Sequence, residues 1–249
     1  HASHSQLGAQ ALQHGKHVLM EKPMTTDVSE AIALRNASKQ SSCFFAVNNT
    51  ASWRTQAVTA RRWVRDDQLI GKVEHVACAM HSPLLWLFDD PANVGWTRPT
   101  GSMRGNGFAW GQLSHLLAWV LQITGLRPVD VACSMVFSTR SGADMHDAAV
   151  FSCENGASIS LTGTGAVPGN AHGDESDESH PHSGKHVSVR VFGSEGSLVY
   201  EGDDQDPSSG DLVVLTRSGE RRVEPGFLFE NYEDTGTGPE SVQAFIKAC

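Results

Sequence analysis

Lys22 lies just after a predicted parallel strand, where its ammonium group could reach a ligand. It follows a short apolar run, residues 17–20, and Pro23 comes directly after it. The run is typical of a buried parallel strand, and proline would end that strand because it lacks a backbone N–H. In open α/β sheets, ligands bind outside the carboxyl ends of the strands. Lys22 could therefore donate a hydrogen bond to a substrate hydroxyl or carbonyl oxygen, although a solvated loop lysine is the ordinary alternative.

His115 lies within a strongly apolar helical pattern. Apolar residues recur at helical spacing around it, and Gly125 would end the helix. These apolar residues are Leu113, Leu116, Leu117, Val120 and Leu121. A histidine in this place could accept or donate a proton near neutral pH. The alternative is a core histidine whose hydrogen bonds are satisfied inside the protein.

Residues 15–23 read G-K-H-V-L-M-E-K-P and resemble a signature of the glucose–fructose oxidoreductase/inositol dehydrogenase/rhizopine-catabolism (Gfo/Idh/MocA) family. Its members are NAD(P)-dependent sugar and polyol dehydrogenases, and the resemblance extends through nearly the whole chain. It implies an α/β fold: part of a doubly wound parallel (Rossmann) sheet, then an α+β domain with a large open, mostly antiparallel sheet. In the family, the lysine of E-K-P lies at the active site beside the nicotinamide. The resemblance makes Lys22 a catalytic candidate and places Glu21, Lys22 and Pro23 near an NAD or NADP cofactor.

Two further places are cofactor candidates through the same resemblance. His4 matches the last residue of a Pro-x-x-x-His stretch that faces the cofactor in the family. A surface histidine at a helix start is the alternative. Asn48 and Asn49 follow the apolar run 43–47, at a position that lies by the nicotinamide ribose and the substrate in the family. Turn chemistry explains them equally well, because asparagine favours turns.

A second family motif, Asp-x-Gly-x-His, is only partly present. In the family its histidine acts as acid or base, and His115 matches it. Gly111 stands in place of the aspartate and Leu113 in place of the glycine, so the carboxylate is absent. Gln112 could hydrogen-bond a substrate hydroxyl, but its amide cannot take a proton at neutral pH. We therefore expect a divergent active site in which Lys22, Gln112 and His115 hold the substrate.

The phosphate-binding motif G-x-G-x-x-G, which opens a dinucleotide-binding domain, occurs nowhere in the sequence. We expect an N-terminally truncated chain whose first βαβ units lie upstream. Residues 1–50 would be the C-terminal part of the Rossmann domain. Residues 51–249 would form the substrate and dimerisation domain, with its C-terminal helix cut short. The isolated chain is expected to be inactive, poorly soluble and unable to bind NAD(P).

Residues 128–216 alternate between apolar and polar and predict one open sheet of about six or more antiparallel strands. The expected strands are 129–137, 147–153, 157–164, 186–192, 197–200 and 211–216. A strand over residues 73–80 would start the second domain. In the family the outer face of this sheet makes the dimer contact, which implies a homodimer or homotetramer. The tract 172–186 is rich in histidines and carboxylates but fits no metal-ligand spacing, so we expect a solvated loop and no metal.

The composition argues against several classes of partner. The net charge is −9, from 19 basic and 28 acidic residues, which disfavours nucleic acid and anionic membranes. No apolar run is long enough to cross a bilayer, and the first residues do not read as a secretory signal. Five spread cysteines lack a C-x-x-C motif, and most lie in apolar runs. They predict buried free thiols in a reducing compartment, and hence a cytoplasmic protein.

These features predict an NAD(P)-dependent oxidoreductase that transfers a hydride between nicotinamide and a sugar, polyol or related carbinol or carbonyl substrate. The alternative is a non-catalytic regulator on the same scaffold, which binds dinucleotide or a protein partner. Gly111 favours this alternative, whereas Lys22 together with His115 disfavours it. The residue that selects NAD or NADP would lie in the upstream part of the dinucleotide-binding domain.

Overall fold

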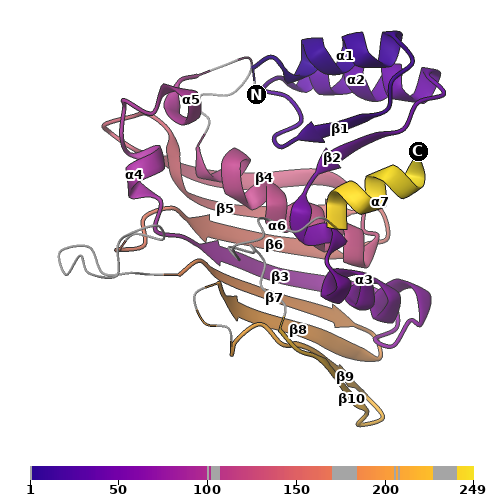
Figure 1. The fold of residues 1–249 in the computed structure, drawn as a ribbon. Helices are drawn as coiled ribbons and strands as arrows, with labels where there is room; N and C mark the ends of the chain where they lie inside the picture. The colour runs from indigo at the N-terminus through magenta and orange to yellow at the C-terminus, as the bar shows by residue number, and fades with distance from the viewer. Residues whose placement is uncertain are drawn as a thin grey trace.

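The computed structural model describes residues 2–99, 101, 107–169, 184–204, 206, 208–226 and 240–249. The chain is α/β, with a two-stranded parallel sheet and an eight-stranded, mostly antiparallel sheet, as expected. Figure 1 shows the small sheet and its helices at the top and the large sheet below. Within the described ranges, no helix combines the length and apolar character that crossing a membrane requires. Residues 172–183, which hold most of the histidine-rich tract, lie outside these ranges.

The small sheet forms a compact unit with two helices. Strand β1 (Val18–Glu21) pairs in parallel with β2 (Phe45–Asn48), and helices α1 (His4–Gln13) and α2 (Val28–Gln40) pack beside them (Figure 1). Asp27 caps α2, because its carboxylate accepts from two backbone N–H groups of the first turn. The buried apolar side chains of this unit are Leu12, Val18, Met20 and Leu34.

The other helical segments connect the two sheets or lie against the large one. They are η1 (Thr50–Trp53), α3 (Thr55–Arg61), η2 (Arg62–Asp66), α4 (Leu85–Phe88), α5 (Val94–Thr97), η3 (Ala109–Leu113), α6 (Ser114–Thr124) and α7 (Glu240–Ala248). The segments η2 and η3 are π-helical turns, and η3 runs directly into α6. Gly125 ends α6 in the left-handed conformation, with φ of 71°. Helices α4 and α5 have four residues each and lie in the connection that follows β3.

The large sheet has the strand order β10-β9-β8-β7-β3-β6-β5-β4. Its strands are β3 (Val73–His81), β4 (Pro128–Phe137), β5 (Asp144–Cys153), β6 (Ser158–Thr164), β7 (His186–Gly193), β8 (Gly196–Asp203), β9 (Leu212–Thr216) and β10 (Arg221–Glu224). All expected strands are present, and β10 is an addition. Strand β6 is antiparallel to β5 but parallel to β3. The long crossover from β3 to β6, which contains α6, permits this parallel pairing.

The main core lies between the large sheet and the helices on one of its faces. Trp119 of α6 packs against Tyr200 of β8 with ring centroids 5.8 Å apart, and both side chains are fully buried. Residues of β5 that point the other way, such as His146, Ala148 and Val150, are exposed. The described part of the sheet therefore has one covered inner face and one open outer face.

The cysteines correct one expectation. All five are free thiols, but only Cys78 and Cys153 are buried. Cys133 is exposed because it lies on β4, the edge strand of the large sheet, where apolar residues are also exposed. Cys249 is exposed next to the end of α7, and Cys43 is half-buried. An apolar sequence around a cysteine predicts burial poorly on an edge strand, because such a strand has a neighbour on one side only.

Candidate active site

The loop after β1 carries Lys22 across to the helices of the large sheet. Its Nζ donates to the carbonyl oxygen of Gly111 over 2.8 Å and lies 5.0 Å from the ring centroid of Trp96. The ring face of a tryptophan attracts a cation at this distance. A second link lies beside it, where Trp110 Nε1 donates to the carbonyl oxygen of Thr25 over 3.1 Å. Lys22 is therefore held by contacts with η3 and α5 rather than lying in solvent.

Gly111 lies in the middle of the π-helical turn η3, beside an aromatic wall. A Cβ added to Gly111 would lie 3.1 Å from the ring of Phe88 and 3.2 Å from the ring of Trp96. These two rings pack edge to face, with centroids 6.1 Å apart. An aspartate at position 111 would therefore force the rings to move by a few tenths of an ångström. The aromatic wall therefore crowds the Cβ position at residue 111, from which the carboxylate of the Asp-x-Gly-x-His motif would extend.

Gln112 is buried and has a partner that the sequence analysis missed. Its Oε1 accepts from Nζ of Lys185 over 2.9 Å, and Lys185 is itself only 3% exposed. The signal was present in the sequence, because Lys185 is in phase with the inward-facing Val187, Val189 and Val191 of β7. A charged residue that extends a row of buried residues indicates a functional or structural polar contact.

His115 lies one helical turn after Gly111, in the first turn of α6. Its side chain is half-buried. Lys22 contacts η3, which runs directly into α6, so the expected catalytic residues Lys22, Gln112 and His115 all belong to or touch one continuous helical segment. The described side chains near this segment form no cluster suited to a metal ion.

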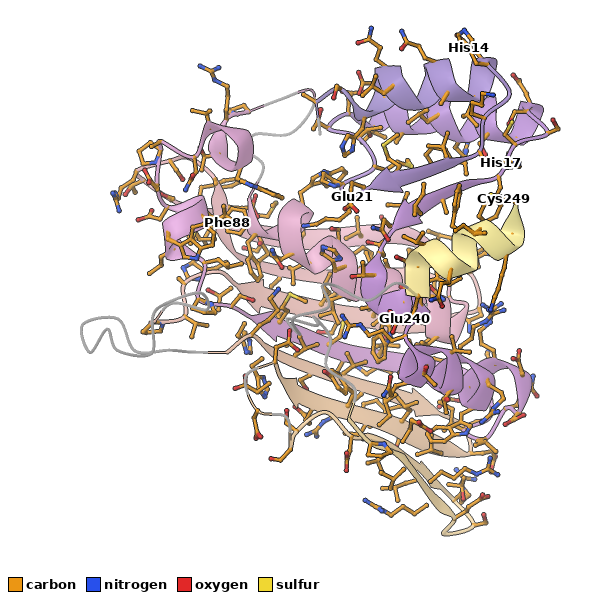
Figure 2. All side chains as sticks on the ribbon, in the orientation of Figure 1. His14, His17, Glu21, Phe88, Glu240 and Cys249 are labelled. Carbon is orange, nitrogen blue, oxygen red and sulfur yellow. The ribbon has the colours of Figure 1, made fainter. Side chains whose placement is uncertain are left out.

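The carboxyl ends of β1 and β2 bring the expected cofactor residues together in two pairs. Glu21 lies opposite Asn48 in the parallel register, and Asn48 Nδ2 donates to Glu21 Oε1 over 2.5 Å. His4 Nδ1 is 2.8 Å from the carbonyl oxygen of Pro23. Figure 2 shows Glu21 at the end of β1, away from His14 and His17.

One atom at this edge fits a bound nicotinamide ribose. Asn48 Oδ1 is buried and has no hydrogen-bond partner among the described residues. A buried acceptor without a partner carries an energetic penalty, which a donor from a ligand would relieve. Asn49 precedes η1 as its N-cap residue, its backbone N–H donates to the carbonyl oxygen of Val47, and its side chain makes no capping hydrogen bond. The residues present therefore suit the nicotinamide end of a dinucleotide, while the phosphate-binding motif is not among the 249 residues.

A pair of buried aspartates anchors the start of η3. Asp144 Oδ2 accepts from the backbone N–H of Ala109 over 2.6 Å, and Asp147 lies beside Asp144. Burial, the negative charge of Asp144 and a hydrogen bond to it raise the pKa of Asp147 to about 8. Asp147 also lines an apolar cavity of about 230 Å³ between η3, α6, β4 and β5. Neither aspartate was among the residues predicted from the sequence to belong to a site.

The fold and the site together define an α/β protein in which the loop after a parallel strand contacts the π-helical turn that leads into α6. Comparison with protein families then places the chain. Residues 57–199 match the GFO/IDH/MocA C-terminal domain, and residues 1–49 match the oxidoreductase family NAD-binding Rossmann fold. The first match covers more than half of the chain, so the chain belongs to the GFO/IDH/MocA family of oxidoreductases.

Individual relatives are more distant. Uncharacterized oxidoreductase C115.03 of Schizosaccharomyces pombe is 28% identical over 127 residues, which are 49% of this chain and 31% of that protein. Two solved structures share the fold. An inositol dehydrogenase homolog from Azotobacter vinelandii, complexed with NADH and myo-inositol, is 20% identical with a TM-score of 0.64, covering 98% of this chain and 61% of that one. Aldose-aldose oxidoreductase from Caulobacter crescentus, complexed with glycerol, is 16% identical with a TM-score of 0.68, covering 99% and 64%. The chain thus spans about a third of the curated relative and less than two thirds of these structures.

Proposed function

We propose that this chain is part of an NAD(P)-dependent oxidoreductase that acts on a sugar, polyol or related carbinol or carbonyl substrate. The observation that carries the proposal is the contact of Lys22 with Gly111, one turn before His115. It brings a cation from the end of a parallel strand to the helix that carries a proton-transfer group. The domain boundary would lie near residue 50, where β2 ends and η1 begins.

Lys22 would bind the oxygen of the reacting carbon. An ammonium group has three N–H donors, and Gly111 takes one of them. A donor and positive charge at that oxygen stabilise negative charge as it develops during reaction. The Trp96 ring and the Gly111 carbonyl keep the ammonium in place before substrate arrives, so little reorganisation is needed.

His115 would take or give the hydroxyl proton, since the absence of an aspartate at position 111 leaves it as the titratable residue of the motif. Gln112 would contribute hydrogen bonding but no proton transfer. The bound nicotinamide supplies the hydride chemistry. Glu21, Pro23, Asn48, Asn49 and His4 are proposed to lie along its ribose side, with Asn48 Oδ1 as the acceptor.

The alternative of a non-catalytic regulator gains no support. The relatives described above are named as oxidoreductases or dehydrogenases. Gly111 was the feature that favoured a regulator, but it lies beside Phe88 and Trp96, where an added Cβ would be crowded.

The test uses the full-length protein with NAD or NADP and a panel that contains glucose, myo-inositol and glycerol. Replacing Lys22 with Ala, or His115 with Ala, is expected to lower kcat/KM by at least about a hundredfold. Lys72→Ala is the matched control, because Lys72 is exposed. Thermal unfolding of each variant shows whether the fold is retained. Near-normal turnover in both site variants would contradict the assignment.

We also propose self-association through the outer face of the large sheet. Four large apolar side chains are exposed there, namely Val136, Val150, Phe192 and Leu215. Exposed apolar surface of this kind on a sheet face favours burial against another copy. Light scattering should find a dimer or tetramer for the wild-type protein and a monomer for Phe192→Glu with Leu215→Glu.

A further inference from the structure

Lys185 is a buried lysine at the start of an apolar row. It lies one residue before β7, faces inward with Val187 and Val189, and is only 3% exposed. Its carbonyl oxygen accepts from the backbone N–H of Asp204 over 3.1 Å, which ties its backbone to the end of β8. Burying an ammonium group costs several kcal/mol unless polar partners receive it. The position of Lys185 therefore requires a specific acceptor on the inner side of the sheet.

Gln112 supplies such an acceptor, and the contact determines which end of its side-chain amide faces Lys185. A lysine can only donate hydrogen bonds, so the amide oxygen of Gln112 must face Nζ of Lys185, 2.9 Å away. The amide nitrogen, with its two N–H groups, then points in another direction. No described residue accepts a hydrogen bond from this nitrogen. Without Lys185, either end of the amide could face the site.

Lys22 and Lys185 bind to two consecutive residues of η3. Lys22 donates to the carbonyl oxygen of Gly111, and Lys185 donates to the side chain of Gln112. Lys22 comes from the small sheet and Lys185 from the large one. Gln112 is consequently next in the chain to the residue that holds the proposed substrate-binding ammonium.

We propose that Lys185 is a positioning residue, which turns Gln112 so that its amide nitrogen donates to an acceptor oxygen of the substrate. This inference rests on the proposed function and adds the chemical class of one recognised group. The group is a carbonyl, carboxylate or hydroxyl oxygen near the oxygen bound by Lys22. A substrate with an ammonium group in that place would be rejected, because it would meet an N–H donor and two lysines.

Two variants separate recognition from packing. Gln112→Glu keeps an acceptor for Lys185, and the contact becomes an ion pair, but the N–H donor is lost. Lys185→Met removes the ammonium group and keeps an unbranched side chain. Gln6→Glu and Lys72→Met are the matched controls, since both residues are exposed. KM, kcat and Tm are measured for the best substrate of the panel with the full-length protein.

Gln112→Glu is expected to raise KM about tenfold, the equivalent of one lost hydrogen bond, with kcat within about threefold and Tm unchanged or higher. Lys185→Met is expected to raise KM and lower Tm. A purely structural role predicts a wild-type KM for Gln112→Glu, because its contact with Lys185 survives. That result, or a wild-type KM for Lys185→Met should Gln112→Glu fail to fold, would overturn the proposal.

A second measurement needs no substrate and separates this inference from the proposed function. The side-chain amide protons of Gln112, assigned in the NMR spectrum by their loss in Gln112→Glu, should exchange with solvent rapidly in the wild type. Protected protons would mean that the nitrogen faces the interior, and the proposal would fail. If the wild-type protein oxidises no member of the panel, the proposed function fails, while the amide measurement still decides the orientation of Gln112.

Discussion

The small parallel sheet and the large mixed sheet differ in the core that supports them. The small unit has four buried apolar side chains and two strands of four residues each. The large sheet has eight strands, and its core includes bulky, fully buried side chains such as Trp119, Tyr200, Phe88 and Phe108. Two strands with so small a core give marginal stability by themselves. The small unit must therefore gain stability from its contacts with the rest of the chain.

Two of the three contacts described here lie at the candidate active site. Lys22 reaches Gly111, Trp110 reaches the carbonyl of Thr25, and Phe44 lies against Phe245 of α7 with ring centroids 5.7 Å apart. The first two join the loop after β1 to the π-helical turn η3. The unit with the larger core, the large sheet with its helices, therefore provides Gln112, Lys185 and His115, whereas the unit with the smaller core provides Lys22.

The largest expected loss of stability comes from the core of the large sheet. Trp119→Ala should lower the free energy of unfolding by about 3–5 kcal/mol, because it removes a fully buried indole that packs on Tyr200. For a chain of this size, Tm should fall by roughly 2–4 °C per kcal/mol in a thermal melt. Trp86→Ala is the control, as Trp86 is 45% exposed. Equal losses in the two variants would mean that Trp119 does not belong to the main core.

Leu34→Ala should weaken the small unit by about 2–4 kcal/mol, since Leu34 is 1% exposed within its four-residue core. The loss should appear as faster hydrogen exchange in residues 4–48, measured by mass spectrometry, with β5 to β8 unchanged. Ile32→Ala, on the same helix and 46% exposed, is the control. Faster exchange throughout the large sheet would show that the two units unfold together and would contradict the comparison.

The sequence predicted those parts of the fold that repeat with a simple period. The alternation of apolar residues located the strands of the large sheet, and the short apolar run before Lys22 located β1. Which strands pair with each other was harder to predict from the sequence. The parallel pairing of β3 with β6 depends on the crossover through α6. The exposure of Cys133 depends on the position of β4 at the edge of the sheet. In the site, Lys22 and Gln112 were selected, but their partners lie 89 and 73 residues away along the chain. Contacts so distant along the chain leave only indirect signals in the sequence. One such signal is that Lys185, one residue before β7, is in phase with the inward-facing positions of that strand.

Asp147, which lies beside the Asp144 side chain that binds η3, should make the free energy of unfolding depend on pH. Its folded pKa of about 8 lies above the ordinary value of 3.8, so the folded state binds this proton more strongly than the unfolded state. The stability that this group contributes is fully present below about pH 4 and is lost as the pH rises towards 8. Asp147→Asn removes the titration and keeps an N–H donor for Asp144. The Tm of the variant should therefore exceed that of the wild type by a margin that grows from pH 4 to pH 8.

Other titratable side chains around Asp147 are few among the described residues. Asp144 is its neighbour on β5, Cys133 of β4 lines the same cavity, and His146 is exposed on the opposite face. Neither η3 nor β6 carries a titratable side chain. Asp130→Asn, at an exposed position on β4, is the control and should show no such trend. A constant Tm difference across this range would contradict the raised pKa of Asp147.

The smallest expected effect is at the junction itself. Trp110→Phe removes the hydrogen bond to the carbonyl of Thr25 and should cost about 1 kcal/mol. Because the bond joins η3 to the loop after β1, hydrogen exchange should become faster in residues 18–25, with no change in β5 to β8. Trp86→Phe is the control at an exposed tryptophan. If residues 18–25 keep their wild-type exchange, the contact of Lys22 with Gly111 is sufficient to hold the loop after β1 on η3.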